Sequence, residues 1–320
     1  MPKLSMQPKT TETTLGELFD KFIAFKKIKN LSEESIIYYE KCYRFFSQYY
    51  PAEQPCSGIT KDICLGYIQY LQQNHRLKDL TINTYLRGVR ALVYYGMELG
   101  YISRFKLELI KADKEIKETY TDAELALLLK KPNIKTCGFA EYRDWVMVNY
   151  FLSTGNRVST VKNIKIEDID FEGSMITLSR TKNRKQQIAP LSRTMLQILQ
   201  EYLQYRQGEP SDYLFCSVYG TQFAKDSLQT TIRIYNHKRG VQKTSVHLFR
   251  HTFAKKWIMN GGDIFRLQKL LGHSSLEIVK EYVNIFGADL KAQYDTFNPL
   301  ESMYRSQNLE AKTALSMKRR

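Results

Sequence analysis

The chain has 320 residues, 43% of them hydrophobic, and a formal net charge of +15 at neutral pH. This length allows two domains with a sizeable core, and the hydrophobic content is ordinary for a globular protein. The positive charge favours an acidic partner, most often nucleic acid and less often an anionic membrane surface, although a merely basic soluble protein is the simpler alternative.

The cysteines and the N-terminus exclude several classes of protein. The five cysteines are odd in number, widely spaced and without a CxxC pair, which argues against a disulfide framework or a zinc ribbon. Residues 1–10 have no apolar signal-peptide core, and no apolar run is long enough to cross a membrane. We therefore expect a cytoplasmic protein that does not contact a membrane.

The first hundred residues predict an all-α unit of four helices. Apolar side chains recur there at three- and four-residue spacing in segments that start near Thr14, Ser32, Thr60 and Thr81, and the last segment ends at Gly100. The basic positions expected outside this core either grip phosphates or form a solvated face. They are Lys26, Lys27, Lys29, Lys78, Arg87 and Arg90.

A second domain is expected after a charged linker. Residues 101–119 are rich in charge, and the capping-box pattern from Thr121 to Glu124 then opens a new helix. An apolar core helix over Glu141–Thr154 is broken at Gly155, just before Arg157.

The apolar period then changes towards two. This change predicts short strands near 164–171, 175–178 and 187–190, with a basic turn at 181–185 that offers Lys182, Arg184 and Lys185. A helix is expected over Leu196–Tyr205. Residues 208–240 are expected to be rich in loops, with a short strand at 213–215.

Chemistry is concentrated in the sequence HLFRHTFA, where His247 and Arg250 lie three residues apart and share a helical face. A guanidinium there can hold a phosphate with two hydrogen bonds, and an imidazole can donate or accept a proton. His247 and His251 have the zinc spacing of metalloproteases, but Leu248 replaces the glutamate that acts as general base. We therefore expect no metal, and we expect His251 to have a packing or capping role.

Two further helices are expected after this motif, and the second carries Tyr282. Gly261 and Gly262 stop one helix, Asp263 caps the next, and Gly272 ends it immediately before His273. Tyr282 then lies beside the apolar stripe of a further helix. The chain has 22 tyrosines, so Tyr282 considered alone is better explained by packing than by catalysis.

Together, the arginine after the Gly155 break, the basic turn, the two histidine motifs and the tyrosine after them resemble the tyrosine recombinase (integrase) family. This family contains Xer-type recombinases and phage-type integrases. The family's second motif reads H-x-L-R-H-T-F-A and continues to L-G-H-S-x7-Y, where this chain has HLFRHTFA and LGHSSLEIVKEY. The resemblance implies a mainly α fold with a small antiparallel sheet. It implies a four-helix core-binding (SAM-like) domain at 14–100, a linker at 101–119 and a mixed α/β catalytic domain at 120–298. A tail at 299–320 contacts another protomer or is simply frayed.

The resemblance also implies site-specific cleavage and rejoining of DNA through a 3′-phosphotyrosyl intermediate, without cofactor, metal or ATP. Tyr282 is then the nucleophile, and Arg157 and Arg250 clamp the non-bridging phosphate oxygens. Lys182 is the general acid for the 5′-oxygen, His247 assists proton transfer and His273 hydrogen-bonds the phosphate. Near Arg157, two positions depart from the family: Thr160 replaces an acidic residue, and Asn156 replaces an apolar one.

Partners and alternatives follow from the same resemblance. It implies double-stranded DNA with paired inverted half-sites, a C-shaped clamp with one domain on each DNA face, a homotetramer acting through a four-way junction, and accessory DNA-bending or directionality proteins. A type IB topoisomerase and a DNA-binding regulator that cuts nothing are the alternatives. Which DNA sites are used, and whether the enzyme serves the host or a mobile element, are left open.

Overall fold

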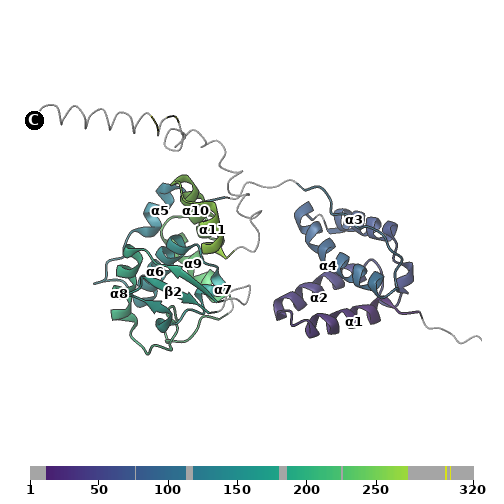
Figure 1. Cartoon of the computed structure of the whole chain (residues 1–320), viewed down its shortest axis with the longest axis horizontal. Coiled ribbons are helices and arrows are strands. Elements are labelled where there is room, and N and C mark those ends of the chain that lie inside the picture. The colour runs from purple at the N-terminus through teal and green to yellow at the C-terminus, as the bar shows by residue number, and fades with distance from the viewer. Residues whose placement is uncertain are drawn as a thin grey trace, which may run out of the picture. The chain divides into compact units, whose positions relative to one another are not determined.

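The computed structural model describes residues 12–75, 77–112, 118–179, 186–224 and 226–272, together with Leu300 and Met303. The chain divides into two compact units, Met1–Glu115 and Ile116–Arg320 (Figure 1). Among the described residues, no helix is both long enough and apolar enough to cross a membrane.

The first unit contains the four expected helices: α1 (Leu15–Ile28), α2 (Glu33–Ser47), α3 (Lys61–His75) and α4 (Asp79–Glu98). A capping box between Thr14 and Glu17 starts α1, and the Ser32 hydroxyl caps α2. A short 3-10 turn, Cys56–Gly58, precedes α3. The fourth helix begins at Asp79, two residues before the expected start at Thr81.

Helix α4 forms the centre of this unit, with ten buried residues between Ile82 and Met97. Gly88 lets α2 approach closely, because a β-carbon at that position would collide with Cys42. Residues beyond Gly100, inside the stretch expected as linker, also pack on α4. The Asn83 amide donates to the Ile110 carbonyl at 2.9 Å and accepts from the Ile110 amide at 3.0 Å.

The second unit combines helices with a small sheet. The helices are α5 (Asp122–Leu129), α6 (Phe139–Thr154), α7 (Val158–Val161), α8 (Arg193–Arg206), α9 (Ser227–Lys238), α10 (Val246–Met259) and α11 (Ile264–Leu271). The strands β1 (Ile169–Asp170), β2 (Met175–Leu178) and β3 (Gln187–Pro190) form an antiparallel sheet in that order. The expected fold class, mainly α with a small antiparallel sheet, is confirmed.

Several expected details were wrong. The region 208–240 contains the three-turn helix α9, and Tyr213 forms only an isolated bridge with Lys165 in place of a strand. The first strand is two residues long, because Ile166–Asp168 forms a 3-10 turn. The helix expected at Leu196 begins at Arg193, where the Ser192 hydroxyl accepts from the Met195 amide.

The core of the second unit is built on α6, which is buried nearly all round and packs against α5, α8, α9 and α10. A separate small cluster joins α10 to α11 through Ala254, Leu267 and Leu271. Helix α10 therefore contacts both the main core and α11, and this contact brings its first turn beside the end of α11.

Candidate functional site

Three of the six expected site residues lie in the described part of the chain: Arg157, His247 and Arg250. The other three, Lys182, His273 and Tyr282, fall outside the described residues.

Arg157 follows a sharp turn at the end of α6. Gly155 ends that helix with φ of +62°, a left-handed conformation that glycine adopts without the strain of a side chain. A β-carbon there would also lie 2.7 Å from Phe253 of α10 and 2.8 Å from Leu271 of α11. The turn therefore needs glycine for both its conformation and its packing, and it places half-buried Arg157 at the N-cap of α7.

Asn156, one of the two departures from the family pattern, has a clear structural partner. Its side-chain amide donates to the hydroxyl of Tyr150 at 2.9 Å, and both residues are buried. Burial raises the pKa of Tyr150, so its hydroxyl stays protonated and needs a hydrogen-bond partner. Thr160, the other departure, is buried within α7, and its amide donates to the Arg157 carbonyl at 2.9 Å.

Arg250 is the fifth residue of α10, at the start of its second turn, and is 3% exposed. Its Nη1 donates to the Gly155 carbonyl at 2.8 Å, and its Nη2 donates to the Leu271 carbonyl at 2.7 Å. Arg157 Nη1 lies 3.5 Å from the same Leu271 carbonyl. Two guanidiniums that are 93 positions apart in the sequence therefore meet at one carbonyl oxygen.

That oxygen belongs to the C-terminal end of α11. Asp263 caps the start of this helix, and Gly272 ends it in the left-handed conformation. The last carbonyls of a helix have no partner within the helix and carry a partial negative charge, so they attract cations and donors. The side-chain amide of Gln187, the first residue of β3, donates to the carbonyls of Lys269 and Leu270 at 2.7 and 3.0 Å.

Three consecutive carbonyls of α11 thus collect two arginines and one glutamine. We call this group the α11 hub; it comprises Arg157, Gln187, Arg250 and the carbonyls of Lys269, Leu270 and Leu271. His273 is only two positions beyond Leu271, and Lys182 only five before Gln187. The residue pattern predicted Gln187 only as part of a strand and gave no sign of this role.

His247 is exposed on the first turn of α10, and its ring packs edge-on against that of His251 with centroids 4.8 Å apart. Within the described ranges, no group of three or more histidine, cysteine or acidic side chains is arranged to hold a metal ion.

Comparison with protein families assigns both units. The model of the phage integrase family matches residues 118–287, and the model of the phage integrase SAM-like domain matches residues 14–114. The chain belongs to the phage integrase family, and the resemblance read from its motifs is confirmed.

Curated relatives match over most of their length. The chain is 29% identical over 296 residues to the tyrosine recombinase XerA of Pyrococcus furiosus, covering 91% of this chain and 98% of the relative. It is 28% identical over 277 residues to the tyrosine recombinase XerC of Pelobacter propionicus, covering 85% and 91%.

Solved structures share the fold. The Tn1549 transposon integrase in complex with circular intermediate DNA is 21% identical with a TM-score of 0.68, covering 85% of this chain and 95% of that one. The XerH site-specific recombinase bound to palindromic difH substrate is 20% identical with a TM-score of 0.66, covering 86% and 83%.

Proposed function

We propose that this protein is a site-specific DNA recombinase that cleaves and rejoins strands through a covalent phosphotyrosine on Tyr282. The observation that carries the proposal is the meeting of Arg157 and Arg250 at the α11 hub, in a chain of the phage integrase family. Two guanidiniums fixed at one point form a preorganised anion site. Phosphoryl transfer depends above all on such positioning and fixed positive charge.

The proposed reaction breaks one phosphorus–oxygen bond as it forms another. The hydroxyl oxygen of Tyr282 attacks the phosphorus while His247 takes its proton, and the 5′-oxygen leaves with a proton from Lys182. Arg157, Arg250 and His273 stabilise the charge on the non-bridging oxygens. The 5′-hydroxyl of a partner strand then attacks the phosphotyrosine and restores the tyrosine. Because the ester conserves the bond energy, rejoining needs no ATP.

The expected partners are DNA, other copies of this chain and accessory proteins. The first unit and the second unit both bind double-stranded DNA at paired inverted half-sites, and four protomers act through a four-way junction. The tail at 299–320 contacts a neighbouring protomer, and accessory DNA-bending proteins set direction. A cytoplasmic location is supported by the cysteines, all five of which are free thiols.

Trapping of the covalent intermediate tests the enzyme activity. Purified protein is incubated with nicked suicide duplexes drawn from DNA flanking its gene, and adducts are resolved on a denaturing gel. We expect the wild type and Tyr219→Phe to form an adduct and Tyr282→Phe to form none. Tyr219 is a suitable control because it is 89% exposed in the turn at residues 217–221.

Other outcomes would support the alternatives. Specific DNA binding by wild-type protein that never forms an adduct would indicate a regulator that cuts nothing. Relaxation of supercoils without a preferred site would indicate a type IB topoisomerase. An adduct with Tyr282→Phe equal to that of the wild type would show that another residue is the nucleophile.

A further inference from the structure

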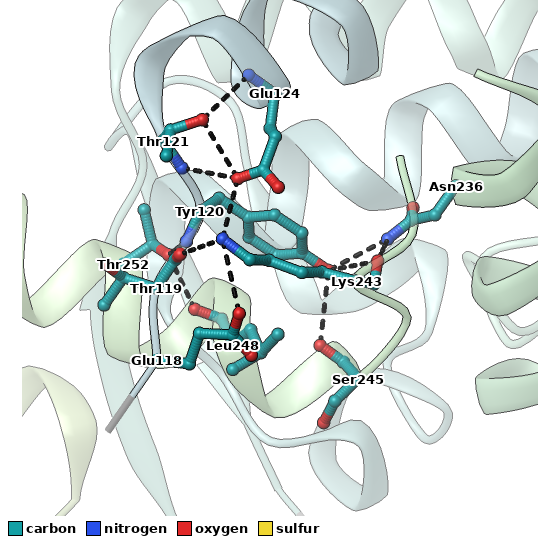
Figure 2. Close-up of polar contacts among 10 residues, drawn as sticks. All are labelled: Glu118, Thr119, Tyr120, Thr121, Glu124, Asn236, Lys243, Ser245, Leu248 and Thr252. Carbon is teal, nitrogen blue, oxygen red and sulfur yellow. Dashed lines mark hydrogen bonds and ion pairs between the residues drawn. The ribbon is translucent and has the colours of Figure 1, made fainter. Parts of the chain in front are cut away.

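The N-terminal end of α10 is held by a lysine from the preceding loop. Lys243 Nζ donates to the Thr119 carbonyl at 3.0 Å and to Glu124 Oε2 at 3.0 Å, and it lies 3.5 Å from Glu118 Oε1 (Figure 2). An ammonium group has three donors, and three oxygens surround this one. The Lys243 side chain is 21% exposed and that of Glu124 is 24% exposed.

Tyr120 holds the same loop from its other side. Its hydroxyl lies 3.3 Å from the Lys243 carbonyl and 3.4 Å from the Ser245 carbonyl, and it accepts from the Asn236 amide at 2.9 Å. Its ring packs on that of Phe249, with centroids 4.5 Å apart. Figure 2 shows Tyr120 between the segment carrying Glu124 and the loop carrying Lys243.

A further contact lies one turn along α10. The Tyr120 amide donates to the Thr252 hydroxyl at 2.9 Å, and that hydroxyl donates to the Leu248 carbonyl at 2.7 Å. Residues 118–124 therefore contact both the loop before α10 and the first two turns of the helix. We call this set of contacts the α10 anchor; it comprises Glu118, Thr119, Tyr120, Glu124, Asn236, Lys243 and Thr252.

The anchor matters because α10 has no side-chain cap of its own. The N-cap residue, Ser245, makes no capping hydrogen bond, although serine is a favoured residue for this role. A lysine near a helix N-terminus is also electrostatically unfavourable, and the carboxylates of Glu118 and Glu124 offset that cost. Although partial burial opposes its charge, the bond and charge of Glu124 raise the pKa of Lys243.

The anchor adjoins the residues of the candidate site. His247 is four positions after Lys243, and Arg250 directly follows Phe249, on which the Tyr120 ring packs. A displacement of the first turn of α10 would move both side chains at once. Preorganised sites lose much of their rate when reacting groups move by about 1 Å.

We propose that Lys243 and Glu124 are positioning residues for the cleavage step, acting through the first turn of α10 on His247 and Arg250. This inference rests on the proposed recombinase function. A competing role for Lys243 is direct contact with a DNA phosphate. The two roles differ in their dependence on Glu124, because removing a nearby carboxylate would not weaken a lysine–phosphate contact.

A double-mutant cycle separates these roles. Lys243→Met, Glu124→Gln and the double variant are compared in single-turnover adduct formation on a nicked suicide duplex, with DNA affinity measured by titration. Glu124→Gln keeps the capping pattern, because glutamine also serves at that position, and so removes mainly the charge. Lys243→Arg restores the positive charge.

The matched control is Lys256→Met. Lys256 pairs with Asp122 and so joins α10 to α5, the helix that carries Glu124, but it lies in the last turn of α10, away from His247 and Arg250. If the rate falls because the α5–α10 contact is loosened in general, Lys256→Met should lose rate as well. If it falls because the first turn of α10 is displaced, Lys256→Met should keep its rate.

We expect Lys243→Met and Glu124→Gln each to lower the single-turnover rate about 10-fold while DNA affinity changes less than about 2-fold. The double variant should be no slower than either single variant, Lys243→Arg should recover most of the rate, and Lys256→Met should match the wild type.

Two results would overturn the inference while adduct formation by the wild type upholds the proposed function. One is a normal rate in Glu124→Gln together with weakened DNA binding in Lys243→Met, which would make Lys243 a DNA contact. The other is an equal loss of rate in Lys256→Met, which would make the effect one of general stability. Failure of the wild type itself to form an adduct would count against the recombinase function.

Discussion

Asp144 is a carboxylate buried inside α6, beside Arg143 from the same helix. Arg143 donates to Asp144 Oδ1 through Nε at 2.9 Å and Nη2 at 2.6 Å, and its Nη1 donates to the Cys216 carbonyl at 2.8 Å. Burial raises the pKa of Asp144 to about 6, although the charge of Arg143 acts in the opposite direction. The folded protein therefore holds this proton more tightly than the unfolded chain, in which aspartate has a pKa of about 3.9.

This shift predicts a pH dependence of stability. Between about pH 4 and pH 6 the folded state binds more protons at Asp144 than the unfolded state, so the free energy of unfolding should fall as pH rises. Asp144→Asn should reduce this pH-dependent decrease in unfolding free energy by up to about 2–3 kcal/mol. Urea denaturation at several pH values measures the unfolding free energy. Glu172→Gln, at an exposed position after β1, is the control, and equal slopes in Asp144→Asn and wild type would contradict the assignment.

The sequence predicted Arg157, His247 and Arg250 as site residues but could not reveal their partners. Arg157 and Arg250 meet at a main-chain carbonyl, and every residue has such a carbonyl, so no residue type marks Leu271 for this role. The sequence likewise could not show that Asn156 bonds Tyr150. The buried hydroxyl of Tyr150 explains why an amide replaces the family's apolar residue at position 156.

The α11 hub shows how elements cooperate around the candidate site. The end of α11, the start of β3, the start of α7 and the N-terminal half of α10 all contribute, although each forms for its own local reasons. A strand end and a helix end are here joined by one side-chain amide, that of Gln187. Its bonds fix the start of β3 against the end of α11.

Removal of that amide should weaken the hub. Gln187→Ala leaves two helix-end carbonyls without this donor, and we expect a loss of about 1–2 kcal/mol in unfolding free energy and a several-fold fall in adduct formation. Gln186→Ala, at the neighbouring exposed position, should leave both unchanged. Thermal melts and single-turnover trapping check the two effects, and equal behaviour of the two variants would remove Gln187 from the hub.

Elements with strong local signals were predictable, and those set by distant contacts were not. The Thr121–Glu124 capping box, the break at Gly155 and strands β2 and β3 follow from local residues. Helix α9 was missed because most of its residues are polar and Asp226 makes no capping bond, although Leu228, Ile232 and Tyr235 form a buried stripe at helical spacing. The α10 anchor joins residues more than 100 positions apart, which spacing patterns do not report.

For the molecule as a whole, the net charge of +15 favours DNA binding, and the number of phosphate contacts sets how that binding responds to salt. In the first unit, Lys26 lies over the rings of Phe22, Phe25 and Tyr39, so it is held by packing, whereas Arg87 is exposed on α4. This contrast makes Arg87 the better candidate for a phosphate contact.

We expect log affinity for DNA to fall linearly with log salt, because each phosphate contact releases a condensed counterion. Arg87→Gln should reduce the magnitude of that slope by about one. Lys131→Gln should leave it unchanged, since Lys131 is paired with Glu201 at 2.6 Å. Fluorescence anisotropy across a salt series measures the slopes, and an unchanged slope in Arg87→Gln would exclude this contact.

The position of Leu271 late in the chain also determines when the site can form during synthesis. Arg157 reaches a partner 114 positions further on, and Tyr120 reaches one 132 positions further on. Domains fold as units while synthesis proceeds from the N-terminus, and contacts of long sequence separation close late. A nascent chain that stops before α11 has no carbonyl at which its two arginines can meet. The α11 hub therefore cannot form until Leu271 has left the ribosome.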